Sequence, residues 1–332
     1  MTRIWLNHWF STAYNIIRLI KQEDPDFFVI GSNANGSSPI QLACDAWYEE
    51  PVLSGDEYVA YCLEFCRQHR VEVFLPHREM LAISREKDRF AEIGTKVMAD
   101  DYDMISVLNR KDTAYELFRK EHIGAVPDYW IVTTAEQFKE GYSALRSRYQ
   151  QVCLKLVRDE GGTSFRLIDD RETGDAALLG SHSGRISYER VLAALGEQTA
   201  FSPIMLMPYL PDEEVSVDCL KTSGGIIMIP RIKGPTRVER IRYDPEILDI
   251  CGAFYEKVPL ECPCNIQLKY LEGTPYMLEV NTRMSGGVQM ACLGSGINLP
   301  NLAVNKLLGV EKSWKNEQKE TLVSYMEIPV IL

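Results

Sequence analysis

The first 105 residues alternate between short apolar runs and segments with helical periodicity, and this alternation restricts the fold more than any other feature. The apolar or β-rich runs lie at 3–6, 27–31, 71–76 and 96–99. Between the first two runs, one helix face carries the apolar residues Ala13, Ile16, Ile17 and Ile20. Strands that alternate with helices form a parallel sheet with helical crossovers. We therefore expect a Rossmann-like or flavodoxin-like unit up to about residue 105.

The loop Gly31–Gly36 follows the second of these runs, where open α/β sheets bind ligands. Its sequence is not G-x-G-x-x-G and no lysine follows Gly36, so we interpret it as a plain strand-to-helix turn. His77 follows the strand that ends at Pro76 and lies at the same expected edge of the sheet. It is a candidate for the lining of a substrate pocket, whereas the other histidines are expected to be structural or exposed.

Composition excludes several classes of protein. The 332 residues have a formal net charge of −11, which disfavours binding to nucleic acid or to an anionic membrane surface. No run of about 18 apolar residues occurs, so no membrane partner is expected. The nine cysteines are scattered without a C-x-x-C pair, which is typical of reduced thiols and indicates a cytoplasmic protein.

The most informative stretch is 265–281, where two β-rich runs flank a Leu-Glu-Gly-Thr-Pro segment. This pattern predicts an antiparallel hairpin that turns near Gly273. A turn centred there places four polar side chains on one face, Asn265, Gln267, Glu279 and Asn281. The buried layer on the opposite face is then Leu268, Tyr270, Leu278 and Val280. One carboxylate beside amide oxygens suits Mg²⁺, and a solvated polar strand face is the alternative.

A second candidate feature is a lysine before a glycine-rich loop. Lys155 lies in the expected strand 152–157 with parity opposite to its leucine neighbours, and Gly161, Gly162 and Thr163 follow. A cation beside such a loop can bind phosphate oxygens, although the Gly161–Gly162 pair alone is also typical of a hairpin turn. The sequence contains no Gly-Lys dipeptide, which excludes a Walker A motif.

The order of these pieces resembles the ATP-grasp superfamily and, within it, the single ATP-grasp unit of the carbamoyl-phosphate synthase large subunit. The resemblance implies that Gln267, Glu279 and Asn281 hold Mg²⁺, or Mn²⁺ in its place, at the phosphates of ATP. It also implies that Arg283 contacts phosphate or substrate. Lys111 matches a phosphate-binding cation, and Lys155 matches the lysine before the mobile glycine loop.

The segment 205–218 looks like the hinge of this family that binds the nucleoside. The resemblance implies Glu214 for the ribose, and for the adenine it implies Met207, Tyr209 and Leu210. Two positions depart from the family pattern, Pro208 where many relatives carry Glu and Thr282 where a proline is common. Carbamoyl-phosphate synthesis uses two ATP-grasp units and this chain has one, so that activity is not expected.

The expected fold is α/β, with α+β character in the ATP-grasp part: a Rossmann-like N-terminal domain followed by a two-lobed ATP-grasp fold. The expected boundaries are 1–105 for the first domain, 106–203 for the small lobe with its glycine loop, and 204–332 for the lobe with the metal site. Arg231, Lys233 and Arg237 form a basic cluster that we place after a strand. Arg231 and Lys233 are candidates for binding substrate carboxylate or γ-phosphate, against the alternative of solvated loop charges.

The resemblance implies a Mg²⁺- and ATP-dependent ligase that activates a small carboxylate as an acyl-phosphate and joins it to an amine. A small-molecule kinase on the same scaffold is one alternative, and a nucleotide-binding regulator without turnover is another. The complete set of Gln267, Glu279, Asn281 and Lys155 argues against the regulator. The identities of the acid and the amine cannot be inferred, and a homodimer is expected only because similar proteins form one.

Overall fold

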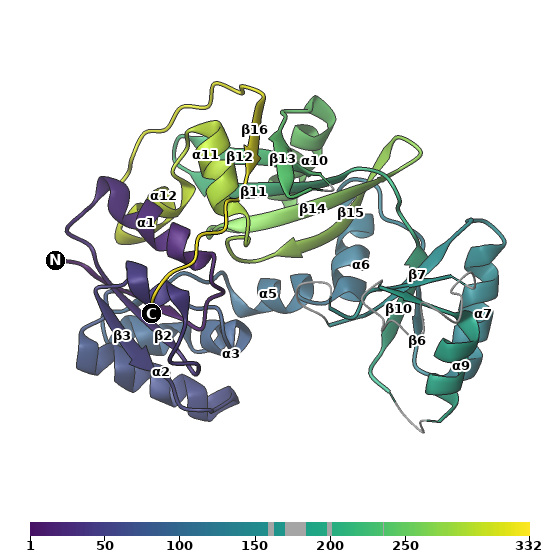
Figure 1. Cartoon of the computed structure of the whole chain (residues 1–332), viewed down its shortest axis with the longest axis horizontal. Helices are drawn as coiled ribbons and strands as arrows, with labels where there is room; N and C mark the ends of the chain where they lie inside the picture. Colours follow the sequence, from purple (N-terminus) through teal and green to yellow (C-terminus); the bar gives the residue numbers. More distant parts are fainter. Residues whose placement is uncertain (159–162, 170–183, 198–200, 235) are drawn as a thin grey trace. The chain divides into compact units, whose positions relative to one another are not determined.

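The computed structural model of the chain describes residues 1–158, 163–169, 184–197, 201–234 and 236–332. They form two compact units (Figure 1). The first unit comprises Met1–Ser106, Glu214–Gln267 and Val280–Leu332, and the second comprises Val107–Glu213 and Leu268–Glu279. The three consecutive domains expected from the sequence stay a prediction.

The N-terminal part of the first unit contains a five-stranded parallel sheet in the order β3-β2-β1-β4-β5. Its strands are β1 (Arg3–Asn7), β2 (Phe28–Asn33), β3 (Ala46–Glu49), β4 (Val73–Leu75) and β5 (Lys96–Val97). The helical elements of this part are α1 (Ala13–Glu23), η1 (Pro39–Ala43), α2 (Gly55–His69), α3 (Met80–Arg85), α4 (Lys87–Glu92) and α5 (Tyr102–Leu108), the last of which runs into the second unit. The expected alternation of strand and helix is confirmed. The sequence pattern misses β3 because this edge strand is half exposed and has no apolar run.

A six-stranded sheet in the order β15-β14-β11-β12-β13-β16 follows later in the chain. Its strands are β11 (Glu214–Thr222), β12 (Gly225–Lys233), β13 (Val238–Ile241), β14 (Cys264–Leu271), β15 (Thr274–Asn281) and β16 (Thr321–Ser324). The accompanying helices are α10 (Pro245–Lys257), α11 (Val288–Ser295) and α12 (Leu299–Leu308). Apolar residues of α1, α11, α12, β11 and β12 share one buried core, so the N-terminal part and this sheet fold as one unit.

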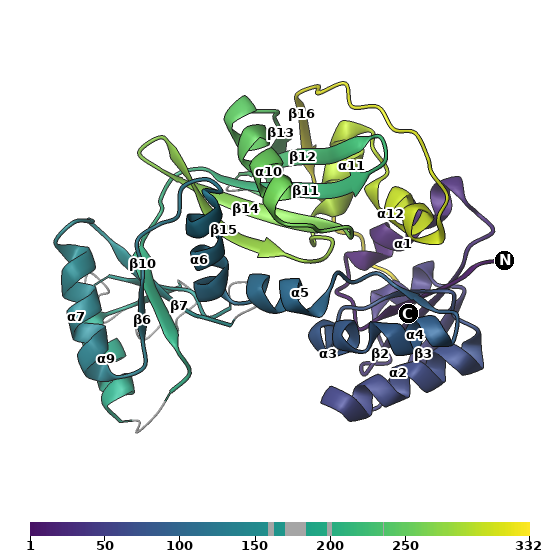
Figure 2. The same cartoon turned by 180° about the vertical axis from the view of Figure 1, so that it is seen from behind.

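The second unit is built on a sheet in the order β6-β10-β7-β8-β9. Its elements are α6 (Lys111–Glu121), β6 (Trp130–Val132), α7 (Ala135–Arg146), β7 (Val152–Leu156), β8 (Arg166–Ile168), β9 (Arg185–Ile186), α9 (Tyr188–Gly196) and β10 (Ile204–Pro208). Helices α7 and α9 lie side by side on one face of this sheet (Figure 2). Leu154 and Leu156 pack toward them, which leaves the opposite face of β7 to Cys153 and Lys155.

The β14–β15 hairpin turns at two residues, Glu272 and Gly273, which have φ angles of +52° and +81°. Positive φ at both positions is the geometry of a type I′ turn, which fits the right-handed twist of the strands. With a two-residue loop, Leu271 is opposite Thr274. A turn centred on Gly273 would instead place Glu272 opposite Thr274, so the expected cross-strand pairing is wrong by one residue at the turn.

The buried face of this hairpin also differs in part from the expectation. Leu268 and Val280 are buried as expected, but Tyr270 and Leu278 are only partly buried and Met277 is fully buried.

All nine cysteines are free thiols, and eight of them are buried. Within the described residues, no helix combines the length and the apolar character that crossing a bilayer requires.

Candidate active site

Two lysines and a glutamate gather around Tyr115 in the second unit. Lys111 is the first residue of α6, and its Nζ lies 3.6 Å from Oε2 of Glu279 on β15. Tyr115, one helical turn later on the same face, donates a hydrogen bond of 3.0 Å to the Leu278 carbonyl. Lys155 on β7 reaches the Tyr115 hydroxyl at 3.5 Å. The structure thus brings together three of the predicted site residues, Lys111, Lys155 and Glu279.

The two lysines and Tyr115 are buried, whereas the Glu279 side chain is 23% exposed. The exposed fractions are 7% for Lys111, 6% for Lys155 and 0% for Tyr115. Burial raises the pKa of Tyr115, and the nearby Glu279 carboxylate raises it further, so the phenol stays protonated. Ammonium groups are costly to bury unless an anion accompanies them. Two ammonium groups held close together in this way can bind the anionic oxygens of a phosphate.

Of the predicted adenine-binding residues, Met207 lies in β10, and Tyr209 and Leu210 follow this strand in the second unit. Met207 is buried and pairs with Cys153 of β7 in the sheet. The Tyr209 N–H donates to the Gln151 carbonyl at 2.9 Å, whereas Leu210 N–H forms no hydrogen bond within the described part of the chain. The Tyr209 ring lies 6.3 Å from the Phe165 ring, centroid to centroid, and Lys269 Nζ lies 5.9 Å from its centroid.

The glycine loop is described only in part. Gly161 and Gly162 lie outside the described residues, so their predicted contact with phosphate stays a prediction. Thr163 is exposed, and the next residue, Ser164, accepts a hydrogen bond of 2.9 Å from the Leu156 N–H. This bond holds the end of the loop against β7.

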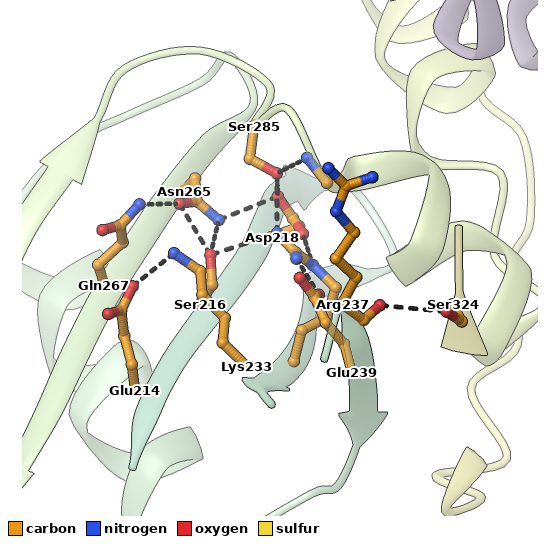
Figure 3. Close-up of polar contacts among 12 residues, drawn as sticks. Glu214, Ser216, Asp218, Lys233, Arg237, Glu239, Asn265, Gln267, Ser285 and Ser324 are labelled. Carbon is orange, nitrogen blue, oxygen red and sulfur yellow. Dashed lines mark hydrogen bonds and ion pairs between the residues drawn. The ribbon is translucent and has the colours of Figure 1, made fainter. Parts of the chain in front are cut away.

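In the first unit, polar side chains line one face of strands β11, β12 and β14 (Figure 3). Gln267 Nε2 donates to Asn265 Oδ1 at 3.2 Å, so the two residues share a face, as expected. Asn265 Nδ2 donates in turn to Ser216 Oγ and to Asp218 Oδ1, both at 3.0 Å. Asn265, Ser216 and Asp218 are at most 1% exposed, so this polar network is buried.

Arg231 lies within β12 and not in a loop after a strand, which corrects the sequence-based placement. It is 2% exposed, and its guanidinium lies between Asp218, at 2.7 Å from Nε, and Glu239. Its Nη2 also donates to Ser216 and Ser285 at 3.2 and 2.9 Å. Burial works against this charge, but the two carboxylates raise the pKa of Arg231.

Lys233 also belongs to β12 and pairs with Glu214 of β11, its partner in the sheet register. Both side chains are partly exposed, at 38% for Lys233 and 25% for Glu214. A cation and an acid at this edge could together orient a ribose or a substrate group. The predicted role of each of them stays a prediction.

Asn281 ends β15, and Arg283 follows it in the first unit. Arg283 Cζ lies 5.8 Å from the centroid of the Phe10 ring, and the Phe10 and His77 rings make an edge contact at 5.3 Å. Burial and the charge of Arg283 lower the pKa of His77 to about 4, so His77 is neutral near pH 7. His77 thus lies among the side chains that surround Arg283.

The predicted metal ligands are distributed over both units. Glu279 belongs to the second unit, and Gln267 and Asn281 belong to the first. Their donors are one carboxylate and two amides, a hard oxygen set that suits Mg²⁺ when phosphate and water complete the coordination. Among the described residues, no three His, Cys, Asp or Glu side chains cluster so as to hold a metal without such help.

Three residues of the site were missed from the sequence. Ser216 and Asp218 interrupt the apolar pattern of β11 at alternate positions, a signal of a buried polar stripe on one face. Tyr115 occurs four residues after Lys111, a spacing that predicts a shared helix face. Both patterns can be recognised in the sequence, but neither of them indicates which residues each side chain contacts.

Comparison with known proteins gives one family and several similar structures. Residues 200–329 match the family model described as "ATP-grasp in the biosynthetic pathway with Ter operon". The chain is 27% identical over 318 residues to the arginine-specific carbamoyl phosphate synthase large chain of Geobacillus stearothermophilus. That match covers 90% of this chain and 28% of the relative, so the chain spans little more than a quarter of the relative's length.

Solved structures share the fold at low sequence identity. The ADP complex of N5-carboxyaminoimidazole synthetase from Staphylococcus aureus has a TM-score of 0.73, at 11% identity over 98% of this chain and 82% of the other. The biotin carboxylase domain of Hydrogenobacter thermophilus 2-oxoglutarate carboxylase, a dimer with MgADP and bicarbonate, has a TM-score of 0.70, at 14% identity over 97% and 73%. An L-amino acid ligase from Bacillus licheniformis has a TM-score of 0.65, at 14% identity over 92% and 74%. The expected resemblance and fold class are confirmed.

Proposed function

Because residues 200–329 match an ATP-grasp family model, we propose that the chain is an ATP-dependent ligase that activates a small carboxylic acid and joins it to an amine. The observation that carries this proposal is the cluster of Lys111, Lys155 and Glu279 around Tyr115. Ammonium groups bind the oxygens of nucleotide phosphates, and a carboxylate close to them can hold a divalent cation at the same phosphates. Similarity to an L-amino acid ligase supports the same reaction class.

The nucleoside end of ATP is assigned to the hinge after β10. The Leu210 N–H can donate to an adenine ring nitrogen, because it makes no hydrogen bond within the described residues. Met207 and Tyr209 provide apolar surface for the ring, and Glu214 is proposed to accept from a ribose hydroxyl. Gly161, Gly162 and Thr163 are proposed to cover the phosphates.

Gln267, Glu279 and Asn281 are proposed to hold the cation, and their hard oxygen donors fit it. Mg²⁺, or Mn²⁺ in its place, neutralises charge on the phosphates when it is bound with the nucleotide. The chain itself supplies only one carboxylate to this set. Metal affinity should therefore be weak without nucleotide and strong with it.

In the proposed reaction, the substrate carboxylate oxygen attacks the γ-phosphorus of ATP, and the bond to the ADP oxygen breaks. Lys111, Lys155 and Arg283 offset the charge on the transferring phosphoryl group. The amine nitrogen then attacks the acyl carbon, phosphate leaves, and the amine loses a proton. Water would hydrolyse the acyl-phosphate, so the site must exclude it during this step.

The test incubates the protein with ATP, Mg²⁺ and pools of carboxylates and amines, and measures the release of ADP and phosphate. Each pool is also left out in turn. A ligase releases both products only when acid and amine are present together. ADP without free phosphate would identify a kinase, and neither product under any mixture would indicate a regulator; both results contradict the proposal.

With an active pair of substrates, Glu279→Ala should reduce ADP formation to background, because the only carboxylate of the metal set is lost. Glu256→Ala is the matched control, since Glu256 is exposed on α10 and should keep the wild-type rate. Circular dichroism of both variants checks the fold. Wild-type turnover in Glu279→Ala would show that the metal assignment is wrong.

We propose small-molecule substrates, a cytoplasmic location and a homodimer as the setting of this activity. The dimer is proposed by similarity to the biotin carboxylase domain of 2-oxoglutarate carboxylase, which is a dimer.

A further inference from the structure

A continuous chain of hydrogen bonds runs from Arg231 to Gln267 through Asp218 and Asn265, and it is buried up to Asn265 and partly buried at Gln267. Arg231 Nε donates to Asp218 Oδ2 at 2.7 Å, and Asp218 Oδ1 accepts from Asn265 Nδ2 at 3.0 Å. Asn265 Oδ1 then accepts from Gln267 Nε2 at 3.2 Å. Figure 3 shows Asn265 between Gln267 and the Ser216–Asp218 pair.

The order of donors and acceptors determines which way each amide points. The Asp218 carboxylate can only accept, so Asn265 must present its NH₂ group to it. The carbonyl oxygen of Asn265 is therefore directed to the other side, where it meets Gln267 Nε2. With its nitrogen held there, Gln267 directs its Oε1 away from Asn265.

Arg231 anchors the start of this chain. Its guanidinium holds Asp218 from one side, and Ser285 Oγ donates to Asp218 Oδ1 at 2.6 Å. Ser285 also accepts from Arg231 Nη2 at 2.9 Å and from the Gly287 N–H at 3.2 Å. The segment that follows Arg283 is thereby tied to the same carboxylate.

We propose that Arg231, Asp218 and Asn265 are positioning residues that present the Gln267 oxygen, and not its nitrogen, to the divalent cation. This inference rests on the proposed function, in which Gln267 is a metal ligand. It also replaces the direct contact of Arg231 with substrate that the sequence suggested, because all three guanidinium nitrogens are bonded within the protein. An amide whose oxygen is already oriented loses less entropy on binding metal, and outer partners of this kind change metal affinity about 10- to 100-fold.

The experiment measures binding of Mn²⁺ to the whole protein in the presence of ADP, from the electron paramagnetic resonance signal of free Mn²⁺. Four proteins are compared: wild type, Gln267→Ala, Asn265→Ala and Asn305→Ala. Asn305 is the matched control because it is also buried in the first unit, but it bonds to Asp24 and Asn301, outside the network. Thermal unfolding of each variant establishes that it is folded.

We expect Mn²⁺ affinity to fall about tenfold or more in both Gln267→Ala and Asn265→Ala, and to stay within twofold of wild type in Asn305→Ala. Wild-type affinity in Asn265→Ala, together with a loss in Gln267→Ala, would overturn the positioning role and leave the proposed function intact. Wild-type affinity in Gln267→Ala would overturn the metal assignment itself. Arg231→Lys should show a partial loss, and if it does not fold, the Asn265 variant decides the outcome.

Discussion

Gly287 lies against the Arg231 guanidinium so closely that no larger residue fits. A Cβ built on Gly287 would lie 2.3 Å from Arg231 Nη1 and 2.7 Å from Cζ. The neighbouring Gly286 is different, because its Cβ would lie 3.7 Å from the Phe10 ring, an ordinary contact distance. Replacing each glycine with alanine therefore compares a clash with a tolerated change one residue apart.

The cost of Gly287→Ala follows from what must move. The guanidinium has to shift by roughly 1 Å to reach a normal contact with the new methyl group. It cannot do so without stretching its bonds to Asp218, Glu239 and Ser285. Overpacking costs about 1–3 kcal/mol, and a weakened hydrogen bond to a buried charge costs about 1.5–3 kcal/mol. We expect a loss of about 3 kcal/mol in the free energy of unfolding.

For Gly286→Ala we expect no loss, and a gain of up to about 1 kcal/mol because alanine restricts the unfolded chain. Thermal unfolding should show a fall in Tm of roughly 6–12 °C for Gly287→Ala and little change for Gly286→Ala. Equal Tm values for the two variants would refute the argument that the guanidinium is held rigidly in its network.

Two further predictions concern pH and the hairpin turn. His77 has its pKa lowered to about 4 by burial and by Arg283, so stability present above pH 6.5 is lost as the pH falls from 6.5 to 4, by at most about 3 kcal/mol. His77→Phe keeps an aromatic ring against Trp9 and Phe10 and should flatten this part of an acid-unfolding curve, and an unchanged curve would count against the assignment. Glu272→Asn should raise the free energy of unfolding in urea by about 0.5–1 kcal/mol, because asparagine tolerates the φ of +52° at the first turn position. Glu272→Gln removes the same charge, but glutamine does not share the tolerance of asparagine for positive φ. An equal gain in the free energy of unfolding in Glu272→Gln would therefore show that the charge, and not the backbone conformation, is responsible.

Local patterns in the sequence were sufficient to predict many elements of the fold. The strand–helix alternation of the first 105 residues and the hairpin that turns near Gly273 are both present in the structure. The opposite parity of Lys155 and its leucine neighbours was predicted in the same way. These features depend on periods of 2 and 3.6 residues and on capping, which act within a few residues along the chain.

The same rules could not predict which charges are buried. Arg231 and Lys233 are two residues apart on one strand face, and the sequence predicts the same surroundings for both of them. In the structure Arg231 is buried among Asp218, Glu239 and Ser285, whereas Lys233 stays partly exposed beside Glu214. The residues that surround each side chain belong to other strands and to the segment after β15. A local sequence pattern therefore cannot predict these contacts.

The sequence by itself determined many of the elements, the face of Lys155 on its strand and the set of candidate ligands, because these depend on neighbours along the chain. Only the tertiary structure decided that Lys111 pairs with Glu279 and that Lys155 meets the Tyr115 hydroxyl. It also decided that a buried arginine and an asparagine orient Gln267. The physical reason is that burial and hydrogen-bond direction are properties of groups brought together from distant positions, and folding alone brings them together.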